Sequence, residues 1–258
     1  MEHLRGMPIV ELISVTAVKC FALEHPESVE LTEHGVPQNR CFALVDGEGS
    51  RLRSSLTSWP IVLRAGYDAD AERLRIVFPD GTVIEESALG NGERVELTYA
   101  DRPVQARVVT GAWEERLARM AGHPVRIVRP DVHGSVLSAP VTLISDGSLE
   151  RLGREAGAAV DGRRFRMLFT LAGCRPHEED EWEGRLLRIG EAVIRAGGPV
   201  DRCAMTTRDP DTGERDLDTL GLIKGYRGLS EGRTIDFGVY ADIVRPGVVS
   251  VGDTVEPL

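Results

Sequence analysis

Short apolar runs separated by turn-forming residues dominate the first part of the chain. Residues 41–53 (CFALVDGEGSRLR) and 74–86 (LRIVFPDGTVIEE) each predict a strand, a turn at Asp-Gly or other glycines, and a second strand. The apolar tract at residues 8–23 is shorter than a bilayer span and contains Glu11 and Lys19, so it predicts a strand-rich core segment and no membrane segment. We therefore expect this half of the chain to be mainly β.

Helical spacing appears clearly at residues 108–122. Trp113, Leu117 and Met120 fall on one face after a Thr-Gly start, and Gly122 ends the pattern. The pattern predicts one amphipathic helix, which we expect to join two halves of the molecule.

Patterns of apolar residues typical of strands and of a helix continue to the end of the chain. Residues 139–157 predict a strand followed by a helix whose N-terminus carries Ser145 or Asp146, and residues 163–173 predict another strand. Apolar and polar residues then alternate around glycines, as in the strands of a barrel or folded sheet, at residues 186–197 and 247–258. The whole pattern predicts a β-dominated α+β protein and leaves the strand order open.

Composition limits the compartment and the class of partner. The chain has 258 residues, enough for one large or two modest domains, and its four cysteines form no C-x-x-C pair and follow no signal-peptide pattern. Free thiols of this kind favour a reducing compartment, so we expect a cytoplasmic protein. The formal net charge of -10 argues against a broad nucleic-acid surface, which needs clustered Lys and Arg.

The most informative stretch is residues 200–216 (VDRCAMTTRDPDTGERD), where Arg202 precedes Cys203. A cysteine beside a cation is biased toward the thiolate, the form that binds metals or attacks substrates. Alternatively, Cys203 could be a small hydrophobic side chain buried in the core, as many free cysteines are. The histidines show no H-x-x-H or H-E-x-x-H spacing, and the chain has no Walker or dinucleotide fingerprint, so zinc hydrolysis and nucleotide chemistry are not indicated.

The same stretch resembles the MOSC family, and most closely the mitochondrial amidoxime-reducing components and their bacterial relatives. Those proteins carry an Arg-Cys followed by a near copy of TTRDPDTG. The resemblance continues in order along the chain through VTAVKC, NRCFALVDGEG, VTLISDGSLERL, RRFR, EEDEW, DRCAMTTRDPDTG, DFGVYADIV and GVVSVGDTV. It therefore covers nearly the whole sequence.

The resemblance implies a fold, a cofactor and a set of site residues. The fold would be a MOSC-type β-barrel domain at residues 101–258 after an N-terminal β-rich MOSC-N-like domain at residues 8–100, with a helical joint near 110–122. The cofactor would be a molybdenum-pterin, with Cys203 as catalytic residue and metal ligand; pyridoxal phosphate is not expected. The implied cofactor-binding positions are Lys19, Cys20, Arg40, Ser145, Arg166, Asp201, Arg202 and Tyr240.

Several of these residues also have a purely structural interpretation. Any single Lys or Arg is usually an ordinary surface cation, Ser145 or Asp146 could only cap a helix, and Tyr240 could pack in the core. The acidic run at 177–184 could be a solvated loop anchored by a tryptophan. These alternatives stay open on the sequence alone.

The sequence departs from the family pattern at three places. Cys20 stands where relatives usually have Ser after the Lys, and Met167 and Leu168 replace Pro and Asn after Arg166. Asp201 stands where relatives often have Ser before the Arg-Cys, and it could pair with Arg202. An apolar side chain at 168 cannot hydrogen bond a pterin edge, so the pterin contacts are the uncertain part of the implied site.

The function implied by the resemblance is reduction of N-hydroxylated or N-oxygenated small molecules. Because the chain has no C-x4-C-x2-C spacing, electrons are expected from a separate donor protein, ferredoxin or cytochrome b5-like, with its reductase. No nucleic-acid or membrane partner is expected. A cofactor or sulfur carrier without reductase turnover is the alternative, and a structural β protein that has lost its cofactor is a third possibility.

Overall fold

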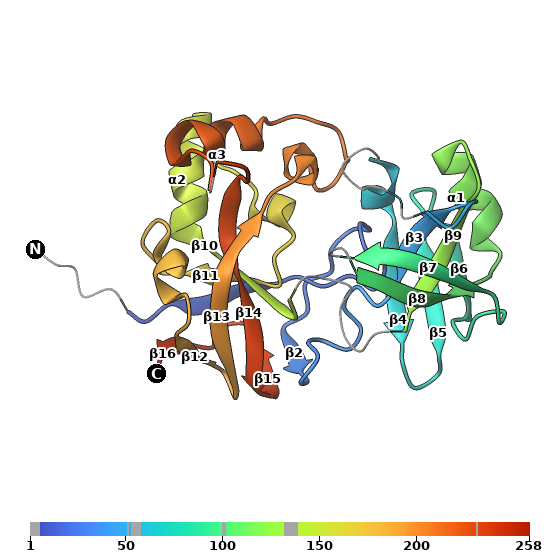
Figure 1. Ribbon diagram of the computed structural model, residues 1–258, viewed down its shortest axis with the longest axis horizontal. Coiled ribbons are helices and arrows are strands. Elements are labelled where there is room, and N and C mark those ends of the chain that lie inside the picture. Colours follow the sequence, from blue (N-terminus) through green and yellow to red (C-terminus); the bar gives the residue numbers. More distant parts are fainter. Residues whose placement is uncertain (1–5, 51, 53–57, 100–101, 132–138, 231) are drawn as a thin grey trace, which may run out of the picture.

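A seven-stranded sheet organises the C-terminal part of the computed structural model, which describes residues 6–50, 52, 58–99, 102–131, 139–230 and 232–258 (Figure 1). β10 runs parallel to β11, and every other neighbouring pair is antiparallel. A bridge between Ile9 and Thr254 connects the two edges, so the sheet is a nearly closed barrel. The strand order is β1 (Ile9–Ile13), β11 (Phe169–Ala172), β10 (Val141–Ser145), β14 (Asp236–Arg245), β13 (Ala192–Asp201), β12 (Leu186–Ile189) and β16 (Val255–Pro257).

The barrel forms because its strands carry apolar residues on the faces that meet inside it. All five residues of β10 are buried, as expected for a strand covered on both faces. The closed interior includes Ile13, Leu143, Phe169 and Ile194, each with no exposed surface. Burial of these side chains is the main stabilising contribution to this half of the molecule.

Two helices pack side by side against the outside of the barrel (Figure 1). α2 (Asp146–Ala156) begins at Ser145, whose hydroxyl accepts a hydrogen bond from the amide of Ser148. α3 (Thr219–Arg227) begins in the same manner at Asp218. The buried residues between the helices and the sheet are Ile144, Leu152, Val160, Phe165, Met167, Val200, Ile223 and Phe237.

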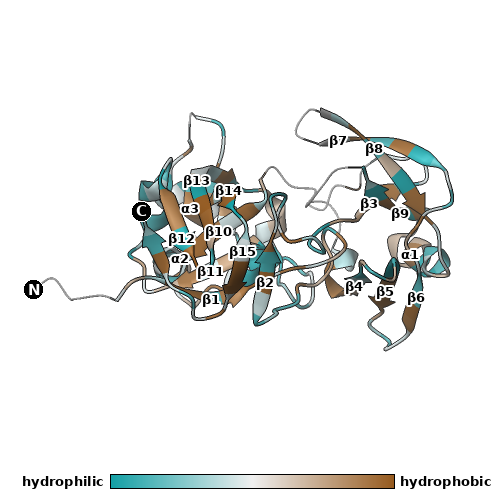
Figure 2. Ribbon diagram, turned by 90° about the horizontal axis from the view of Figure 1, so that it is seen from below, coloured by the Kyte–Doolittle hydropathy of each residue, from teal (hydrophilic) through white to brown (hydrophobic). Residues whose placement is uncertain are grey.

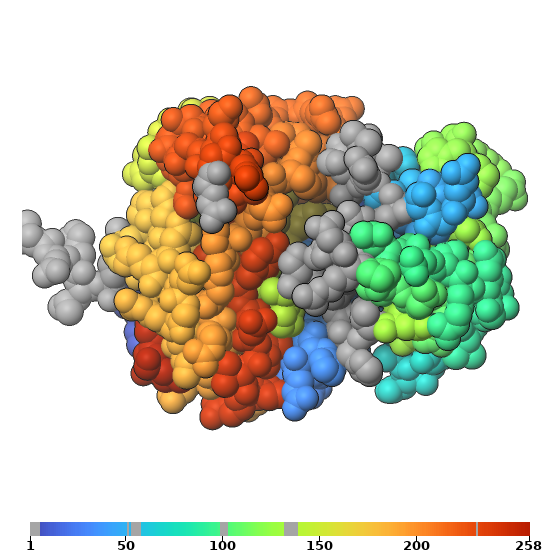
Figure 3. All heavy atoms as spheres, viewed as in Figure 1, coloured from blue at the N-terminus to red at the C-terminus, as the bar shows by residue number. Residues whose placement is uncertain are grey.

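The other lobe is built from two smaller sheets and one helix. Figure 2 shows brown, apolar segments on the strands of both lobes, and Figure 3 shows the two lobes as neighbouring masses. Trp113 of α1 (Trp113–Ala121) is fully buried in the centre of this lobe. The sheets have the orders β3 (Ala43–Asp46), β9 (Val125–Pro130), β8 (Arg102–Val109), β7 (Arg94–Tyr99), and β4 (Arg64–Asp68), β5 (Arg73–Val77), β6 (Val83–Ser87), with a 3₁₀ turn η1 (Trp59–Val62) before β4.

Strand pairing crosses the predicted division near residue 100. β1 pairs with β11 of the barrel, and β2 (Ser28–Leu31) pairs with β15 (Gly247–Ser250). Conversely, β9 pairs with β3 in the smaller lobe. The two lobes thus each contain segments from both sides of residue 100, and the division of the chain into domains at 8–100 and 101–258 stays a prediction.

Most elements predicted from periodicity are present. The helix ends at Gly122 in the left-handed conformation, the Asp-Gly hairpin is β5–β6, and the predicted strand–helix pair is β10–α2. The fold class, β-dominated α+β with a barrel, is confirmed. Within the described residues, no helix combines the length and apolarity needed to cross a membrane.

Two segments differ from the prediction or lie outside the description. Residues Gly162–Phe165 form a 3₁₀ turn, η2, because the carboxylate of Asp161 accepts the amide of Arg163 and starts the turn. The strand predicted from residue 163 begins only at Phe169. The second strand predicted within 41–53 includes residues 51 and 53, which are outside the described residues.

Candidate functional site

Cys203 lies two residues after the end of β13 and directly before the 3₁₀ turn η4 (Ala204–Thr207), and it is exposed. The two threonines that follow it fix this turn. The Thr206 hydroxyl donates to the carbonyl of Cys203 over 3.2 Å, and the Thr207 hydroxyl donates to the carbonyl of Ala204 over 2.8 Å. The cysteine is therefore presented from a restrained backbone.

The Asp-Pro-Asp-Thr-Gly sequence forms a tight turn beyond η4. One carboxylate oxygen of Asp209 accepts the amides of Asp211 and Thr212 over 2.9 and 2.8 Å. Gly213 has φ +74°, and a Cβ there would meet the carbonyl oxygen of Ser58 at 2.7 Å. Only glycine fits this position, so the turn holds the chain after Cys203 in one path.

A pocket of about 160 Å³ opens beside Cys203 at the surface of the barrel. Every residue predicted for the site except Ser145 lines it. The lining consists of Lys19, Cys20, Arg40, Thr142, Arg164, Phe165, Arg166, Met167, Val200, Asp201, Arg202, Cys203, Met205, Thr206 and Tyr240. Segments far apart in sequence thus meet at one place, while the binding role of each residue stays a prediction.

Three arginines of the pocket bond to main-chain carbonyls instead of carboxylates. Arg40 donates to the carbonyl of Arg166 over 2.6 Å, and Arg166 donates to the carbonyl of Phe21 over 2.5 Å. Arg202 donates to the carbonyl of Phe237 over 2.7 Å. Among the described residues, no carboxylate forms an ion pair with any of the three, so no direct contact with a carboxylate offsets their positive charges.

Burial of these uncompensated cations is reflected in their pKa values. Burial, reinforced by the charge of Arg166, lowers the pKa of Arg40 to about 9. Burial lowers the pKa of Arg202 to about 10 and also lowers the pKa of Arg166. The guanidinium groups remain cationic at neutral pH. The pocket is therefore a concentrated positive site on an acidic protein, suited to an anionic ligand.

The backbone at the pocket is strained. Cys20, Arg40 and Arg166 adopt left-handed conformations with φ of 79°, 54° and 55°, a region that non-glycine residues rarely occupy. Such conformations cost of order 1–3 kcal/mol each and occur preferentially at functional sites. Here the conformation aims the three side chains into one pocket.

Ser145 is not part of this pocket. Its hydroxyl caps α2 and donates to the buried carboxylate of Glu179 over 2.6 Å, where Ser148 also donates over 2.7 Å. Burial raises the pKa of Glu179. Glu179 lies in η3 (Glu178–Trp182), so the acidic segment is anchored to the helix N-terminus by this carboxylate as well as by Trp182.

Two positions that depart from the family pattern, Leu168 and Asp201, can now be placed relative to the pocket. Leu168 is 1% exposed and packs in the barrel core, so its side chain does not line the pocket. Asp201 is exposed and accepts from the Tyr240 hydroxyl over 3.5 Å, while the guanidinium of Arg202 turns inward to the backbone. Leu168 therefore leaves the pocket unchanged, whereas Asp201 adds a carboxylate to the pocket lining without forming an ion pair with Arg202.

Arg164 is the main residue that the sequence reasoning missed. It is 8% exposed, lines the pocket, and forms two hydrogen bonds of 2.6 Å with the carboxylate of Asp216. The quoted RRFR motif contained it, but its partner is 52 positions away along the chain. Met167 was missed because only the fold brings it near Cys203, and Met205 and Thr206 were missed because closeness in sequence does not show which way a side chain points.

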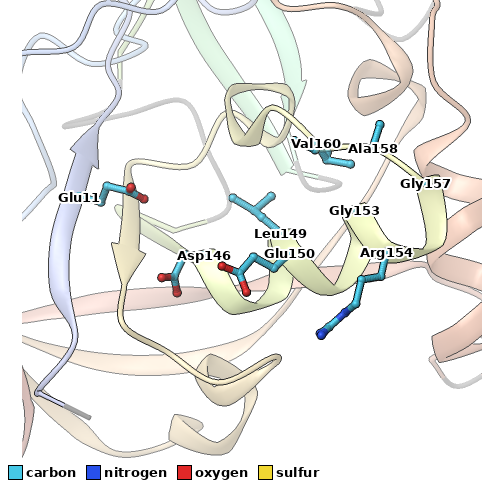
Figure 4. Close-up of a pocket in the computed structure, with 10 residues that line it drawn as sticks. Glu11, Asp146, Leu149, Glu150, Gly153, Arg154, Gly157, Ala158 and Val160 are labelled. Atoms are coloured by element: carbon cyan, nitrogen blue, oxygen red, sulfur yellow. The ribbon is translucent and has the colours of Figure 1, made fainter.

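A larger hollow of about 560 Å³ lies along α2 (Figure 4). Leu149, Gly153 and Ala158 contribute small apolar surface, and the carboxylates of Glu11 and Glu150 border it. None of the predicted site residues lines this hollow. The thiol and the cations predicted for the site thus line the smaller pocket beside Cys203.

The C-terminal half of the chain is similar to a known protein family. The family model of the MOSC domain matches residues 129–256. The mouse protein named mitochondrial amidoxime-reducing component 1 is 34% identical over 125 residues, which cover 46% of this chain and 36% of that protein. The human protein of the same name is 31% identical over 125 residues with the same coverage. The chain thus spans little more than a third of these relatives.

A solved structure supports the fold. The YuaD protein from Bacillus subtilis superposes with a TM-score of 0.50, covering 98% of this chain and 96% of that one. The sequence identity is 12%, so this likeness concerns the fold alone.

Proposed function

Because this chain belongs to the MOSC-domain proteins through residues 129–256, we propose that it is a molybdenum-cofactor oxidoreductase that reduces N-hydroxylated or related N-oxygenated small molecules. Cys203 is the proposed metal ligand. The relatives supply the reaction class, because an amidoxime is an N-hydroxylated amidine. The observation that carries the proposal is the meeting of an exposed thiol with three uncompensated guanidinium groups in one pocket.

The residues of the pocket fit the implied cofactor. A pterin-molybdenum cofactor requires a soft protein ligand for the metal and cations for its anionic phosphate. Cys203 offers the thiolate, and Arg40, Arg166 and Arg202 offer guanidinium donors that bond to main-chain carbonyls and neutral side chains. The pocket volume of about 160 Å³ is below the range typical of sites that enclose a whole ligand, so a bound ligand would extend beyond the enclosed part.

Each group has a proposed task. Cys203 holds the metal from its restrained turn, and the pocket arginines bind and orient the anionic end of the cofactor. Asp201 and Tyr240 lie together at the rim, where a phenol and a carboxylate can position a polar substrate. The bound cofactor supplies two-electron redox chemistry, while the protein supplies binding, orientation and access.

The electrons for this reaction are proposed to come from a separate donor protein, ferredoxin or cytochrome b5-like, with its reductase. The net charge of -10 favours a donor with a complementary basic face. A cytoplasmic location is part of the same proposal and rests on the free thiols.

A reductase assay tests the proposed function. Protein purified from a host that makes the pterin cofactor is given a reduced viologen dye as artificial donor and an amidoxime as substrate, and formation of the amidine is measured. Turnover is expected for the wild type and is expected to be lost in Cys203→Ala, with the fold retained by circular dichroism. Full turnover by Cys203→Ala would show that Cys203 is not the metal ligand.

A second candidate function is a cofactor or sulfur carrier, favoured by the presence of a second thiol, Cys20, in the same pocket. A carrier would hold cofactor or sulfur without reducing the amidoxime. Molybdenum or thiol-bound sulfur on the wild type, lost in Cys203→Ala, together with no amidine from either protein would favour this function over the first.

A further inference from the structure

Arg163 and Arg164 are adjacent arginines that both bind the loop following Cys203. Arg163 donates to Asp211 over 2.9 and 2.8 Å and also pairs with Asp161. Arg164 donates to Asp216 through both terminal nitrogens over 2.6 Å. The two pairs join η2 to the loop at both ends.

The two arginines differ in their surroundings. The side chain of Arg163 is 33% exposed and does not line the pocket, whereas that of Arg164 is 8% exposed and does. Asp216 uses both oxygens on the terminal nitrogens of Arg164, so the guanidinium plane is fixed by a two-point contact.

The third nitrogen of Arg164 has no acceptor. Its Nε is buried and forms no hydrogen bond, and among the described residues it is the one such side-chain atom on a residue that lines the pocket. A buried donor without an acceptor costs of order 1–3 kcal/mol. A ligand atom able to accept this hydrogen bond would remove that cost.

We propose that Arg164 is a ligand-binding residue of this pocket, that its Nε–H donates to an oxygen or nitrogen acceptor on the bound ligand, and that Asp216 is the positioning residue that aims it. The assignment rests on the proposed function of the pocket. Since Asp216 neutralises Arg164, this residue contributes direction and a hydrogen bond, while Arg40, Arg166 and Arg202 contribute net charge.

Three substitutions separate ligand binding from simple support of the loop. Arg164→Lys keeps a cation opposite Asp216 but removes the Nε–H. Asp216→Asn weakens the pair but leaves the guanidinium, and its charge, in the pocket. Arg163→Lys is the matched control, because the same change is made one residue away on an arginine outside the pocket.

The readouts are molybdenum per protein, after purification from a host that makes the pterin cofactor, and the melting temperature of the cofactor-free protein. For Arg164→Lys we expect molybdenum to fall about tenfold with a melting temperature within a few degrees of wild type, since one charge-assisted hydrogen bond is lost. For Asp216→Asn we expect the larger loss of melting temperature and the smaller loss of molybdenum. Arg163→Lys should retain wild-type molybdenum.

The opposite pattern overturns the assignment. Arg164 only supports the loop if, in Arg164→Lys and Asp216→Asn, the loss of molybdenum merely follows the decrease in melting temperature. The same conclusion holds if Arg164→Lys retains as much molybdenum as Arg163→Lys.

Failure of the proposed function is visible separately, because the wild type would then hold no molybdenum. In that case the cofactor-free proteins are treated with iodoacetamide, and the slowing of Cys203 alkylation by inorganic phosphate is followed by mass spectrometry. The assignment predicts slowing in the wild type and in Arg163→Lys that is reduced several-fold in Arg164→Lys. Absence of slowing in the wild type, or equal slowing in all three proteins, contradicts it.

Discussion

Two sets of arginines meet beside Cys203 and differ in how the protein treats their charge. The pocket arginines, Arg40, Arg166 and Arg202, point at main-chain carbonyls and have lowered pKa values. The loop arginines, Arg163 and Arg164, bind aspartates, and these hydrogen bonds raise their pKa values. The same residue type therefore offers net positive charge to a ligand where no carboxylate pairs with it, and supports the loop, with at most a directed hydrogen bond left for a ligand, where a carboxylate does.

This difference predicts that removal of the charge affects protein stability differently in the two sets. The largest effect is expected for Arg40→Met, which should weaken cofactor binding roughly tenfold to a hundredfold, the value of one charge-assisted interaction. The free energy of unfolding of the cofactor-free protein should change by less than about 1 kcal/mol, since the hydrogen bonds to Arg166 and Asn39 are lost but a buried, repelled cation is removed. Molybdenum content and urea unfolding measure the two quantities, and a large loss of stability would show that Arg40 is mainly structural.

Arg164→Met should destabilise the cofactor-free protein more than Arg40→Met does. Breaking its pair with Asp216, in which the arginine is buried and the aspartate is exposed, is expected to lower the free energy of unfolding by roughly 1–2 kcal/mol, less than for a fully buried pair because water can reach the freed carboxylate. Urea unfolding of the cofactor-free protein measures this value. Equal stability of Arg164→Met and Arg40→Met would remove the distinction between the two sets.

Lowering the pH should weaken the ion pairs between Arg164 and the aspartates of the loop that follows Cys203. The Arg164 guanidinium lowers the pKa of Asp216, and main-chain amides lead the lowering of the pKa of Asp209. A carboxylate with a lowered folded-state pKa stabilises the fold above its unfolded pKa near 4, and that stabilisation is lost as the pH falls through the folded-state value. The free energy of unfolding, measured between about pH 5 and pH 3, should depend less steeply on pH in Arg164→Met than in the wild type. Identical slopes would contradict the pairing.

The smallest expected effect concerns backbone strain. Cys20→Gly should raise the free energy of unfolding by about 0.5 kcal/mol, because glycine tolerates φ of 79° but gains entropy when unfolded. Cys41→Gly is the matched control, and it should be destabilising because Cys41 packs against the core of the smaller lobe without a positive φ. A loss of stability in Cys20→Gly similar to that in Cys41→Gly would argue against strain at Cys20.

Local pattern predicted the elements of this fold better than their pairing. The spacing of Trp113 and Leu117 and the Asp-Gly turn after Phe78 are local signals, and both give the expected elements. The pairing of β1 with β11 joins segments more than a hundred residues apart, and no periodicity within either segment encodes it.

The site was predictable as a set of motifs, but the direction of each side chain was not. Ser145 serves as a helix cap and partner of Glu179, the simpler of its two interpretations. Leu168 faces the core because the chain turns at Arg166 in a left-handed conformation, which the sequence pattern does not reveal. Arg164 could not be separated from Arg163 until the fold placed Asp216 opposite it.

The most direct test of the central claim is the molybdenum content of the wild type and of Cys203→Ala, both purified from a host that makes the pterin cofactor. The account predicts close to one molybdenum per wild-type protein and almost none in the variant, with similar melting temperatures for the cofactor-free forms. Molybdenum absent from the wild type, or retained fully by Cys203→Ala, would contradict the assignment of this pocket.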